Sequence, residues 1–495
     1  MSSTESSCSP TTPAQCGGVP RASSAAPASD AHLPDGPRAR VVVAVASLGF
    51  FLITLDVSIV NVALASIREQ LGGGVRGQQW IIDGYTLLFA ALLLFAGNLA
   101  DRIGARRALV VGIVAFTLTS AACALAPGAG ALVAARCAQG ASAAIVLPAS
   151  MALIREAFPD PRRRARALGI WAVGGAVSAV LGQPLGGLLT SVDWRWIFTI
   201  NVPVGVLMLG LLLLVAPSPV RPARFDVAGQ VLAVVALSAL VFGLIEGGHS
   251  GFAEPEVLAA LAVAVAALAA FVGVQAKGRA PMLPLELFAA RGMRLALPVG
   301  FTFMVANLGH VFVVSLFLQQ QLGLSPLHAG LVFVPAALLA VVGNLASGPV
   351  TNRLGTRVPV VAGQLSMVAG LVALVAATAA TDPADGWPWL VALALVPVGA
   401  GGSLAMPPVT GVVLEGVAPE RAGTASAVLN TFRQIGGAVA IAVFGALIAE
   451  PAGFLPGLRT SLLVCAALLL LTAVNSLRIG APGSTALERT AVAAR

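Results

Sequence analysis

The sequence predicts an all-α protein that crosses a membrane many times. Hydrophobic residues make up 58% of its 495 residues and charged residues only 10%, where soluble domains carry about 25%. So few charges cannot solvate the surface of a soluble protein of this length, and lipid must therefore cover much of it. Long apolar runs follow one another along the chain, and the arginines are scattered in short groups between them. This pattern favours one polytopic membrane protein over several soluble domains.

Fourteen apolar runs are long enough to span a membrane, which takes about 20 residues. They lie near 41–66, 78–98, 108–126, 129–153, 166–190, 195–217, 226–246, 256–276, 294–320, 326–349, 358–380, 388–413, 422–447 and 458–478. The segment 1–40 is rich in Ser, Ala and Pro, and we expect a disordered cytoplasmic tail there and a second cytoplasmic tail at 481–495. A cleavable signal peptide would have a shorter apolar run than the one around Asp56, so the first helix is expected to be retained.

The positions of the basic residues test this topology independently. With the N-terminus inside the cell, 23 of the 29 Arg and Lys residues fall in inner segments. The outer segments contain only Arg68, Arg76, Arg195 and Arg459. Such a bias predicts that both termini are cytoplasmic. It also explains the net charge of +8 without a nucleic-acid partner, because the basic residues are scattered between apolar runs.

A ten-residue pattern occurs twice, 251 residues apart. The segment 97–106 after the second run aligns without gaps with 348–357 after the tenth, and Gly, Arg, Gly and Arg recur at matching places. A weaker pair places Gly140 and Pro148 opposite Gly399 and Pro407. Two related halves are typical of secondary transporters, in which the substrate binds between the halves. We therefore expect a six-helix half at 41–217, two additional helices with linkers at 218–280, and a second six-helix half at 281–480.

Five segments resemble signatures of one known family. They are 55–64 in the first run, 97–107 after the second, 136–140 in the fourth, 182–187 in the fifth, and 194–198 with 200–205 around the sixth. Together they are similar to the motifs of the fourteen-helix drug:proton antiporters of the major facilitator superfamily. This resemblance covers roughly residues 41–480. It departs at the fifth run, where Gln183 separates Gly182 from Pro184 and the family often has Gly-Pro.

The resemblance implies roles for two of these motifs. The residues Gly97, Asp101, Arg102, Gly104, Arg106 and Arg107 would form a cytoplasmic gate that stabilises the outward-facing state through charge pairs and helix-end dipoles. We expect Asp101 just ahead of the third helix, where a carboxylate interacts favourably with the helix dipole. The residues Gly182, Pro184, Gly186 and Gly187 would form a kinked antiporter helix that allows close helix approach. A plain basic loop and generic small-residue packing are the respective alternatives.

The energy source is expected to be an ion gradient. The only lysine, Lys277, does not belong to a glycine-rich phosphate-binding loop, and no such loop occurs in the sequence. Ionisable residues inside a membrane are costly, so those present are candidates for function. Asp56 in the first helix and Asp83 in the second are candidates for proton coupling or substrate binding, and the predicted helices 9–14 contain no Asp or Glu. A structural role for Asp56, or solvation of Asp83 near the outer interface, is the alternative.

Two arginines are also expected inside helices. Arg136 should face a cavity or an acidic partner, and the resemblance implies a role in proton transfer, with a fixed structural ion pair as the alternative. For Arg433, a structural role and a contact with the substrate are equally expected. Glu246 is expected in a solvated outer loop, and His310 is expected to be a hydrogen-bonded core histidine that could also titrate.

The leading functional hypothesis is a proton-coupled antiporter that exports drugs or antibiotics across the cytoplasmic membrane. A proton symporter that imports a small metabolite with the same fold is the alternative. A membrane-embedded enzyme would need a convergent nucleophile, base or metal set, and the sequence shows none with persuasive spacing. The expected partners are protons, lipid and a small amphiphilic substrate, with no cofactor or metal, and the protein is expected to be a monomer.

Overall fold

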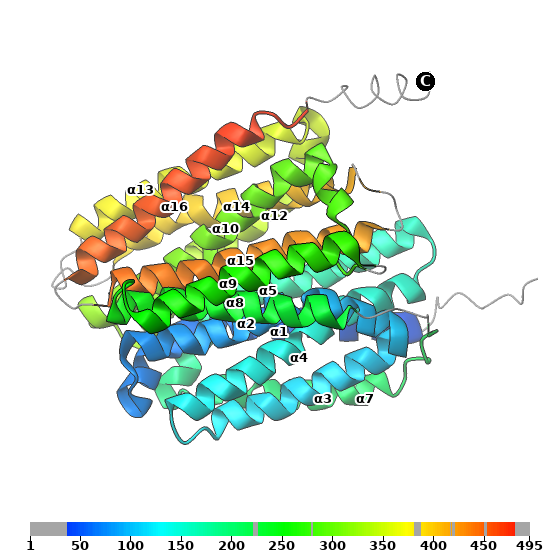
Figure 1. Ribbon diagram of the computed structural model, residues 1–495, viewed down its shortest axis with the longest axis horizontal. Helices are drawn as coiled ribbons and strands as arrows, with labels where there is room; N and C mark the ends of the chain where they lie inside the picture. The colour runs from blue at the N-terminus through cyan, green and yellow to red at the C-terminus, as the bar shows by residue number, and fades with distance from the viewer. Residues whose placement is uncertain are drawn as a thin grey trace, which may run out of the picture.

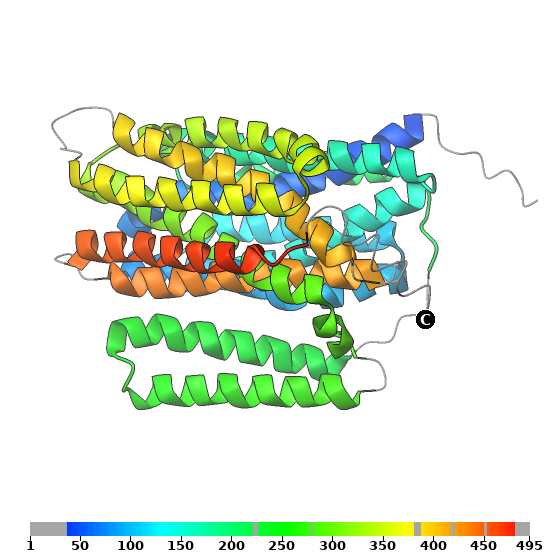
Figure 2. The same cartoon turned by 90° about the horizontal axis from the view of Figure 1, so that it is seen from above.

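The computed structural model describes residues 37–220, 226–278, 281–380, 388–415, 417, 421–449 and 453–480. Within these ranges every regular element is helical. The helices lie side by side along the longest axis, and α1 begins at the end of the bundle where α16 ends (Figures 1 and 2). The first helix begins at Pro37, so residues 37–40 are helical, not part of a tail as predicted. The remainder of the first predicted tail and the second predicted tail lie outside the described residues.

The N-terminal group contains seven helices. They are α1 (Pro37–Leu71), α2 (Gly74–Ile103), α3 (Ala105–Ala124), α4 (Ala129–Ala157), α5 (Pro161–Val192), α6 (Trp196–Thr199) and α7 (Asn201–Leu212). The sequence sets these bounds with ordinary signals. Before α5, the side chain of Asp160 accepts a hydrogen bond from the backbone N–H of Arg163 at 2.8 Å, and Pro161 occupies the first helical position.

The C-terminal group follows the same plan. It comprises the 3₁₀-helix η1 (Leu285–Ala289), α10 (Arg291–Leu316), the π-helical turn η2 (Phe317–Gln321), α11 (Pro326–Val332), α12 (Val334–Leu354), α13 (Arg357–Ala380), α14 (Trp389–Glu415), α15 (Ala422–Leu447) and α16 (Phe454–Ser476). The repeated sequence has a repeated conformation. Gly104 between α2 and α3 has φ 88°, and its counterpart Gly355 between α12 and α13 has φ 79°. A β-carbon disfavours such positive φ values, so glycine is needed at both turns.

Two helices lie between these groups in sequence and beside them in space. They are α8 (Val227–Ser250) and α9 (Pro255–Lys277), which form an antiparallel pair along one side of the bundle (Figure 2). The inner helix, α8, packs against α2 of the N-terminal group and α15 of the C-terminal group. At the end of the pair where α8 begins and α9 ends, Gln275 donates a 2.5 Å hydrogen bond to Asp226 and accepts one from the backbone N–H of Leu283. This pair therefore touches both groups.

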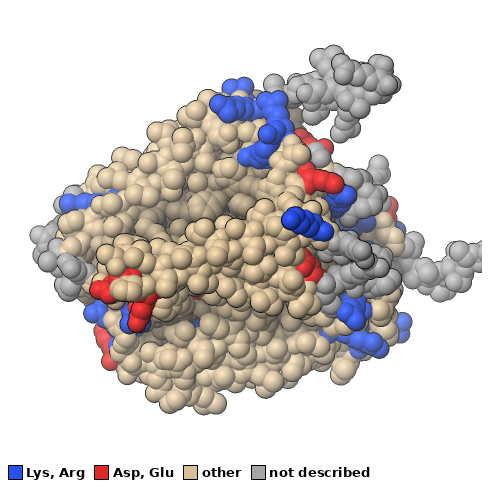
Figure 3. All heavy atoms as spheres, viewed as in Figure 1, with Lys and Arg blue, Asp and Glu red and all other residues tan. Residues whose placement is uncertain are grey.

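A helix occupies each of the fourteen predicted positions. In the described residues, twelve helices are long and apolar enough to cross a membrane, and a pair bent by 57°, Gly74–Leu93 with Phe95–Ile103, could add a thirteenth. The remaining position is the shorter apolar stretch Trp196–Leu212. The all-helical polytopic fold is confirmed, whereas the count of fourteen crossings stays a prediction. The middle of the visible face is almost free of charge, as lipid contact requires (Figure 3).

The two groups of helices meet at the end of the bundle that carries the α1–α2 turn. There Gln79 of α2 donates hydrogen bonds to the backbone carbonyls of Ile441 and Ala442 of α15, at 3.1 and 2.8 Å. Ser315 of α10 donates to the carbonyl of Asn61 of α1 at 3.1 Å. All of these side chains are buried. The groups are therefore held together at the end opposite to Pro37 and Ser476.

Candidate transport and coupling site

The two charged candidates Asp56 and Arg136 form a buried ion pair. Asp56 projects from α1 and Arg136 from α4, and the guanidinium Nη1 lies 2.5 Å from the carboxylate Oδ2. Both side chains are almost completely buried. Arg136 also donates through Nε to the backbone carbonyl of Ile81 in α2, at 3.1 Å. One arginine thus connects three helices, and its charge is balanced by a carboxylate, as an arginine inside a membrane requires.

Three uncharged side chains complete the pair, and the sequence-based candidates omitted them. Gln139 of α4 and Asn201 of α7 each donate a 2.9 Å hydrogen bond to Oδ1 of Asp56. Ser120 of α3 accepts from both amides, at 2.7 and 3.1 Å. Gln139 and Asn201 lie in two of the segments that carried the family resemblance, and buried amides in apolar runs are the signal that could have identified them. With Arg136, the Asp56 carboxylate accepts from three donors.

Aromatic rings cover the guanidinium of Arg136. Its Cζ lies 4.3 Å from the ring centre of Tyr85 and 5.7 Å from that of Phe198. Such contacts stabilise a cation, most of all where water is excluded. We call Asp56, Ser120, Arg136, Gln139 and Asn201 the N-half polar cluster. Because α1, α3, α4 and α7 all contribute to it, a change of charge at Asp56 acts on four helices at once.

Asp83 lies outside this cluster. Its side chain is completely buried, and neither carboxylate oxygen has a hydrogen-bond partner among the described residues. Gln79, one turn earlier, contacts α15, and Leu87, one turn later, packs with Ala438 and Ala442 of α15. Residues four apart share a helix face, so Asp83 lies at the α2–α15 interface between the two groups of helices. The alternative considered for Asp83, solvation near the outer interface, is therefore wrong.

Arg433 lies in the C-terminal group and is not part of the N-half polar cluster. Its Nη1 donates to Oδ1 of Asn430 at 3.2 Å, and its Cζ lies 5.4 Å from the ring centre of Phe303 in α10. The side chain is partly exposed, and its Nε has no hydrogen-bond partner among the described residues. The structure thus separates the four predicted coupling residues into one ion pair, Asp56 with Arg136, and two residues without an ion-pair partner among the described residues.

The predicted gate motif spans the turn between α2 and α3, with one correction. Gly97, Asp101 and Arg102 belong to α2, which ends at Ile103, whereas Arg106 and Arg107 begin α3. Asp101 therefore lies in the last turn of α2 and not in a turn just ahead of α3 as predicted, and the dipole of α2 disfavours a carboxylate at that end. Arg106 fixes the turn instead, because its Nε donates to the carbonyl of Leu212 at 3.0 Å and its backbone N–H donates to Ser218.

The glycines of the antiporter motif are sites of close helix contact. A β-carbon on Gly182 would lie 2.5 Å from Ser58 of α1, and one on Gly186 would lie 2.8 Å from the carbonyl of Ile59. Gly187 instead faces α11, where a β-carbon would collide with the backbone of Pro326 and Leu327. Pro184 lies between them, inside α5. Through Gly182 and Gly186 the motif packs α5 against α1 of the N-terminal half, and through Gly187 it packs α5 against α11 of the C-terminal half.

Two further candidates were also assigned from sequence. His310 is a buried core residue whose Nδ1 lies 2.6 Å from the carbonyl of Ala306, in agreement with the prediction. Glu246 is not in a solvated loop, because α8 continues to Ser250 and leaves Glu246 only 7% exposed. Its Oε1 lies 2.7 Å from Nη2 of Arg76, close enough for an ion pair although the angles do not make a hydrogen bond.

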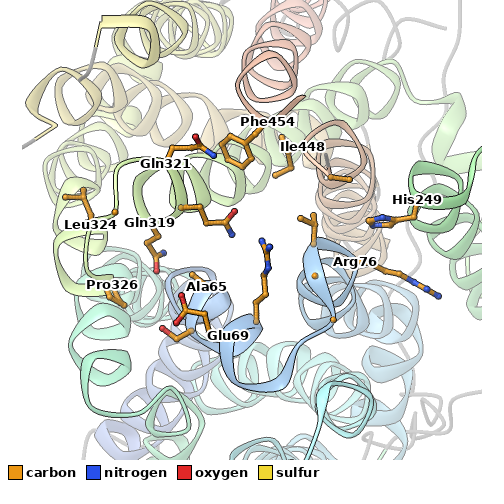
Figure 4. Close-up of a pocket in the computed structure, with 18 residues that line it drawn as sticks. Ala65, Glu69, Arg76, His249, Gln319, Gln321, Leu324, Pro326, Ile448 and Phe454 are labelled. Carbon is orange, nitrogen blue, oxygen red and sulfur yellow. The ribbon is translucent and has the colours of Figure 1, made fainter. Parts of the chain in front are cut away.

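A cavity of about 870 Å³ opens at the end where the halves meet. Arg68, Glu69 and Arg76 line it from α1 and α2, and Gln319 and Gln321 line it from η2 (Figure 4). His249 of α8 stands at its edge, with Nε2 3.2 Å from Oε1 of Gln79. No group of three metal-ligating side chains occurs in the described part of the chain. The cavity is polar and lies beyond the buried contacts that hold the halves together.

These features define a polytopic membrane transporter built from two related helical halves. The chain belongs to the Major Facilitator Superfamily, whose sequence profile matches residues 46–441. The suspected family is thereby confirmed.

Similar proteins are known from several bacteria. The methylenomycin A resistance protein of Streptomyces coelicolor is 36% identical over 91% of this chain and 95% of its own length. The multidrug resistance protein Stp of Mycobacterium tuberculosis is 37% identical over 81% of this chain and 74% of its own length. The tetracenomycin C resistance and export protein of Streptomyces glaucescens is 35% identical over 86% of this chain and 80% of its own length.

Solved structures share the fold at low sequence identity. A D-xylose–proton symporter matches with a TM-score of 0.63 at 15% identity, and the match covers 89% of this chain and 98% of the symporter. A POT family transporter in complex with 5-aminolevulinic acid matches with a TM-score of 0.65 at 13% identity, covering 88% of this chain and 96% of its own. These likenesses establish the arrangement of the helices.

Proposed function

We propose that this protein exports drugs or antibiotics across the plasma membrane in exchange for protons, by alternating access. Export is supported by the relatives, which are named as resistance or export proteins and align over most of this chain. The substrate is a small amphiphilic molecule. The bias of Arg and Lys toward one set of loops supports an orientation with both termini in the cytoplasm.

Asp83 is the observation that carries proton coupling. A buried, ionised carboxylate without a cation or a hydrogen-bond donor is strongly disfavoured, so the acid holds its proton in this conformation. Separation of α2 from α15 would expose Asp83 to the outer water, from which the ionised carboxylate takes up a proton before the interface can close again. Closure of the outer end and proton uptake then become one event, and the proton enters from outside, as exchange for an exported compound requires.

Asp56 plays a different part in the proposed cycle. Its three donors, Arg136, Gln139 and Asn201, suit the ionised form. A proton transferred to Asp56 would leave Arg136 buried beside a neutral partner, which is a costly arrangement. Protonation would therefore loosen the contacts among α1, α4 and α7, and thereby link charge at Asp56 to the shape of the N-terminal half.

The conformation fits one stage of alternating access. In the proposed orientation the Gln79–Ala442 contact lies at the outer end, and contacts that hold the halves together there are what the inward-facing stage requires. The gate motif at the α2–α3 turn lies at the other end, where it would stabilise the outward-facing state. Glycine contacts between α5 and α11 provide a surface on which the halves can pivot.

Everted membrane vesicles with an acidified interior test the proposal. Addition of methylenomycin A or tetracenomycin C should dissipate the pH gradient in wild-type vesicles and not in Asp83→Asn vesicles. Asp193→Asn is a matched control, because Asp193 is a partly exposed residue outside the site. If cells are protected while no compound dissipates the gradient, coupling to protons is wrong. Accumulation of the compounds in intact cells would instead support the importing symporter.

A further inference from the structure

The C-terminal half contains a cation without a counter-charge. Arg433 lies in the middle of α15, and no ion-pair partner for it occurs among the described residues. The described helices of this half contain two acids, Glu286 in η1, which pairs with Arg421, and Glu415 at the last position of α14, and neither forms an ion pair with Arg433. An arginine inside a membrane protein normally faces a partner or a water-filled cavity.

The two internal arginines have opposite environments. Arg136 is fully buried, and the carboxylate of Asp56 balances its charge. Arg433 is partly exposed, its hydrogen bond goes to the neutral amide of Asn430, and its Nε has no partner among the described residues. Arg136 therefore has a full set of partners, whereas the contacts of Arg433 leave its charge unbalanced and its side chain partly exposed.

The surroundings hold the guanidinium in place. A β-carbon on Gly300 of α10 would lie 3.2 Å from the Cγ of Arg433, so the absence of a side chain there makes room for the arginine stem. Phe303, one turn further along α10, lies beneath the guanidinium and reaches α14, where a β-carbon on Gly402 would come within 2.7 Å of its ring. Both Phe303 and Arg433 are partly exposed. A cation and a flat apolar surface are thus presented together.

We propose that Arg433, Asn430 and Phe303 form a subsite for the anionic group of an amphiphilic substrate, such as a carboxylate on an aromatic or alicyclic body. This inference rests on the export function proposed above and specifies its substrate class. The guanidinium offers a planar set of N–H donors that matches a carboxylate, and Phe303 offers contact to the adjoining apolar body. A cationic substrate would meet an unbalanced positive charge here and be repelled.

The test is equilibrium binding of three probes that share one ring system and differ in charge. Protein in lipid nanodiscs is titrated calorimetrically with 1-naphthoate, 1-naphthalenemethanol and 1-naphthylmethylammonium, with empty nanodiscs as the blank. Wild-type protein should bind naphthoate the most tightly. Arg433→Gln should weaken naphthoate binding by about 10- to 100-fold, the usual effect of losing a hydrogen bond to a charged group, and leave the neutral probe unchanged. Arg433→Lys should retain part of the preference.

The controls separate this subsite from a structural role. Arg459→Gln removes another partly exposed arginine, in α16, and should leave all three affinities unchanged. Equal loss of every probe in Arg433→Gln, or no preference of the wild type for naphthoate, would overturn the proposal. Binding in nanodiscs needs no proton gradient, so loss of the anion preference leaves the vesicle experiment intact. Conversely, if naphthoate binding is preferred in nanodiscs but no compound dissipates the gradient in vesicles, proton-coupled export is contradicted while the anion subsite stands.

Discussion

The side chain of Gln79 in α2 donates a 2.8 Å hydrogen bond to the backbone carbonyl of Ala442 in α15, and so joins the two halves of the transporter. The same amide also donates to Ile441, and its Oε1 lies 3.2 Å from His249 of α8. One uncharged residue therefore connects the N-terminal half, the C-terminal half and the additional helix pair.

Replacement of Gln79 by Ala should release the closed end. Each buried hydrogen bond contributes about 1 kcal/mol, and loss of both favours the conformation in which this end is open. Spin labels at the exposed residues Ser191 and Thr460, in a cysteine-free background, should show longer distances by double electron–electron resonance. Gln78→Ala is the matched control, because Gln78 bonds to Leu64 within one half. Unchanged distances in Gln79→Ala would remove this residue from the closure.

The Asp56–Arg136 pair should behave as a unit in stability. Asp56→Ala or Arg136→Ala alone should destabilise the protein by about 3–5 kcal/mol, because each leaves a buried charge without its partner. The double variant should lose clearly less than the sum of the two, as measured by unfolding in SDS. The partly exposed Asp193–Arg195 pair, 3.9 Å apart, should show a coupling below about 1 kcal/mol in the same cycle. Additive losses at Asp56 and Arg136 would contradict the pairing.

Gly187→Ala should impair transport by separating α5 from α11. The added methyl group would meet the backbone of Pro326 and Leu327, and overpacking of this kind costs about 1–3 kcal/mol. Initial export rates in everted vesicles should fall, while the amount of protein in the membrane stays constant. Gly169→Ala lies on the same helix with open space around it and should transport normally. Equal rates for the two variants would show that this contact is unimportant.

Gly104→Ala should disturb the α2–α3 turn more than Gly97→Ala, although both residues belong to the gate motif. Gly104 has φ 88°, at which a residue with a β-carbon is strained by about 1–2 kcal/mol, whereas a β-carbon on Gly97 meets no atom within 4 Å. Thermal unfolding in detergent should show the difference, and Gly355→Ala should resemble Gly104→Ala. Equal sensitivity at positions 97 and 104 would mean that conformation is not the reason for glycine here.

The helices were predictable because each apolar run is long enough to span a bilayer and its ends carry arginine, proline or glycine. Asp56 and Arg136 were both identified as candidates, since any charge in such a run is conspicuous. Their pairing was not predictable, because they are 80 residues apart and the contact depends on how α1 packs against α4. Gln139, Asn201 and Ser120 were missed because uncharged polar residues are common in membrane helices.

The errors also have physical causes. Glu246 was placed in a loop because two glycines follow it, yet α8 continues through both glycines to Ser250. Asp101 was placed in a turn just ahead of the third helix because the apolar run before it ends near residue 98, yet α2 continues to Ile103 and the break falls at Gly104.

The two halves meet along two sides of the bundle, at the α2–α15 seam and at the α5–α12 seam, and the position of α8 and α9 makes these two joints different. Along the α2–α15 seam, α8 packs against both partners and shields the joint from the bilayer. Along the α5–α12 seam, Leu181, Leu188, Leu338 and Leu345 are exposed on the lipid-facing surface. A hydrophobic compound dissolved in the membrane therefore meets an asymmetric protein, in which an additional helix pair covers one of the two joints between the halves.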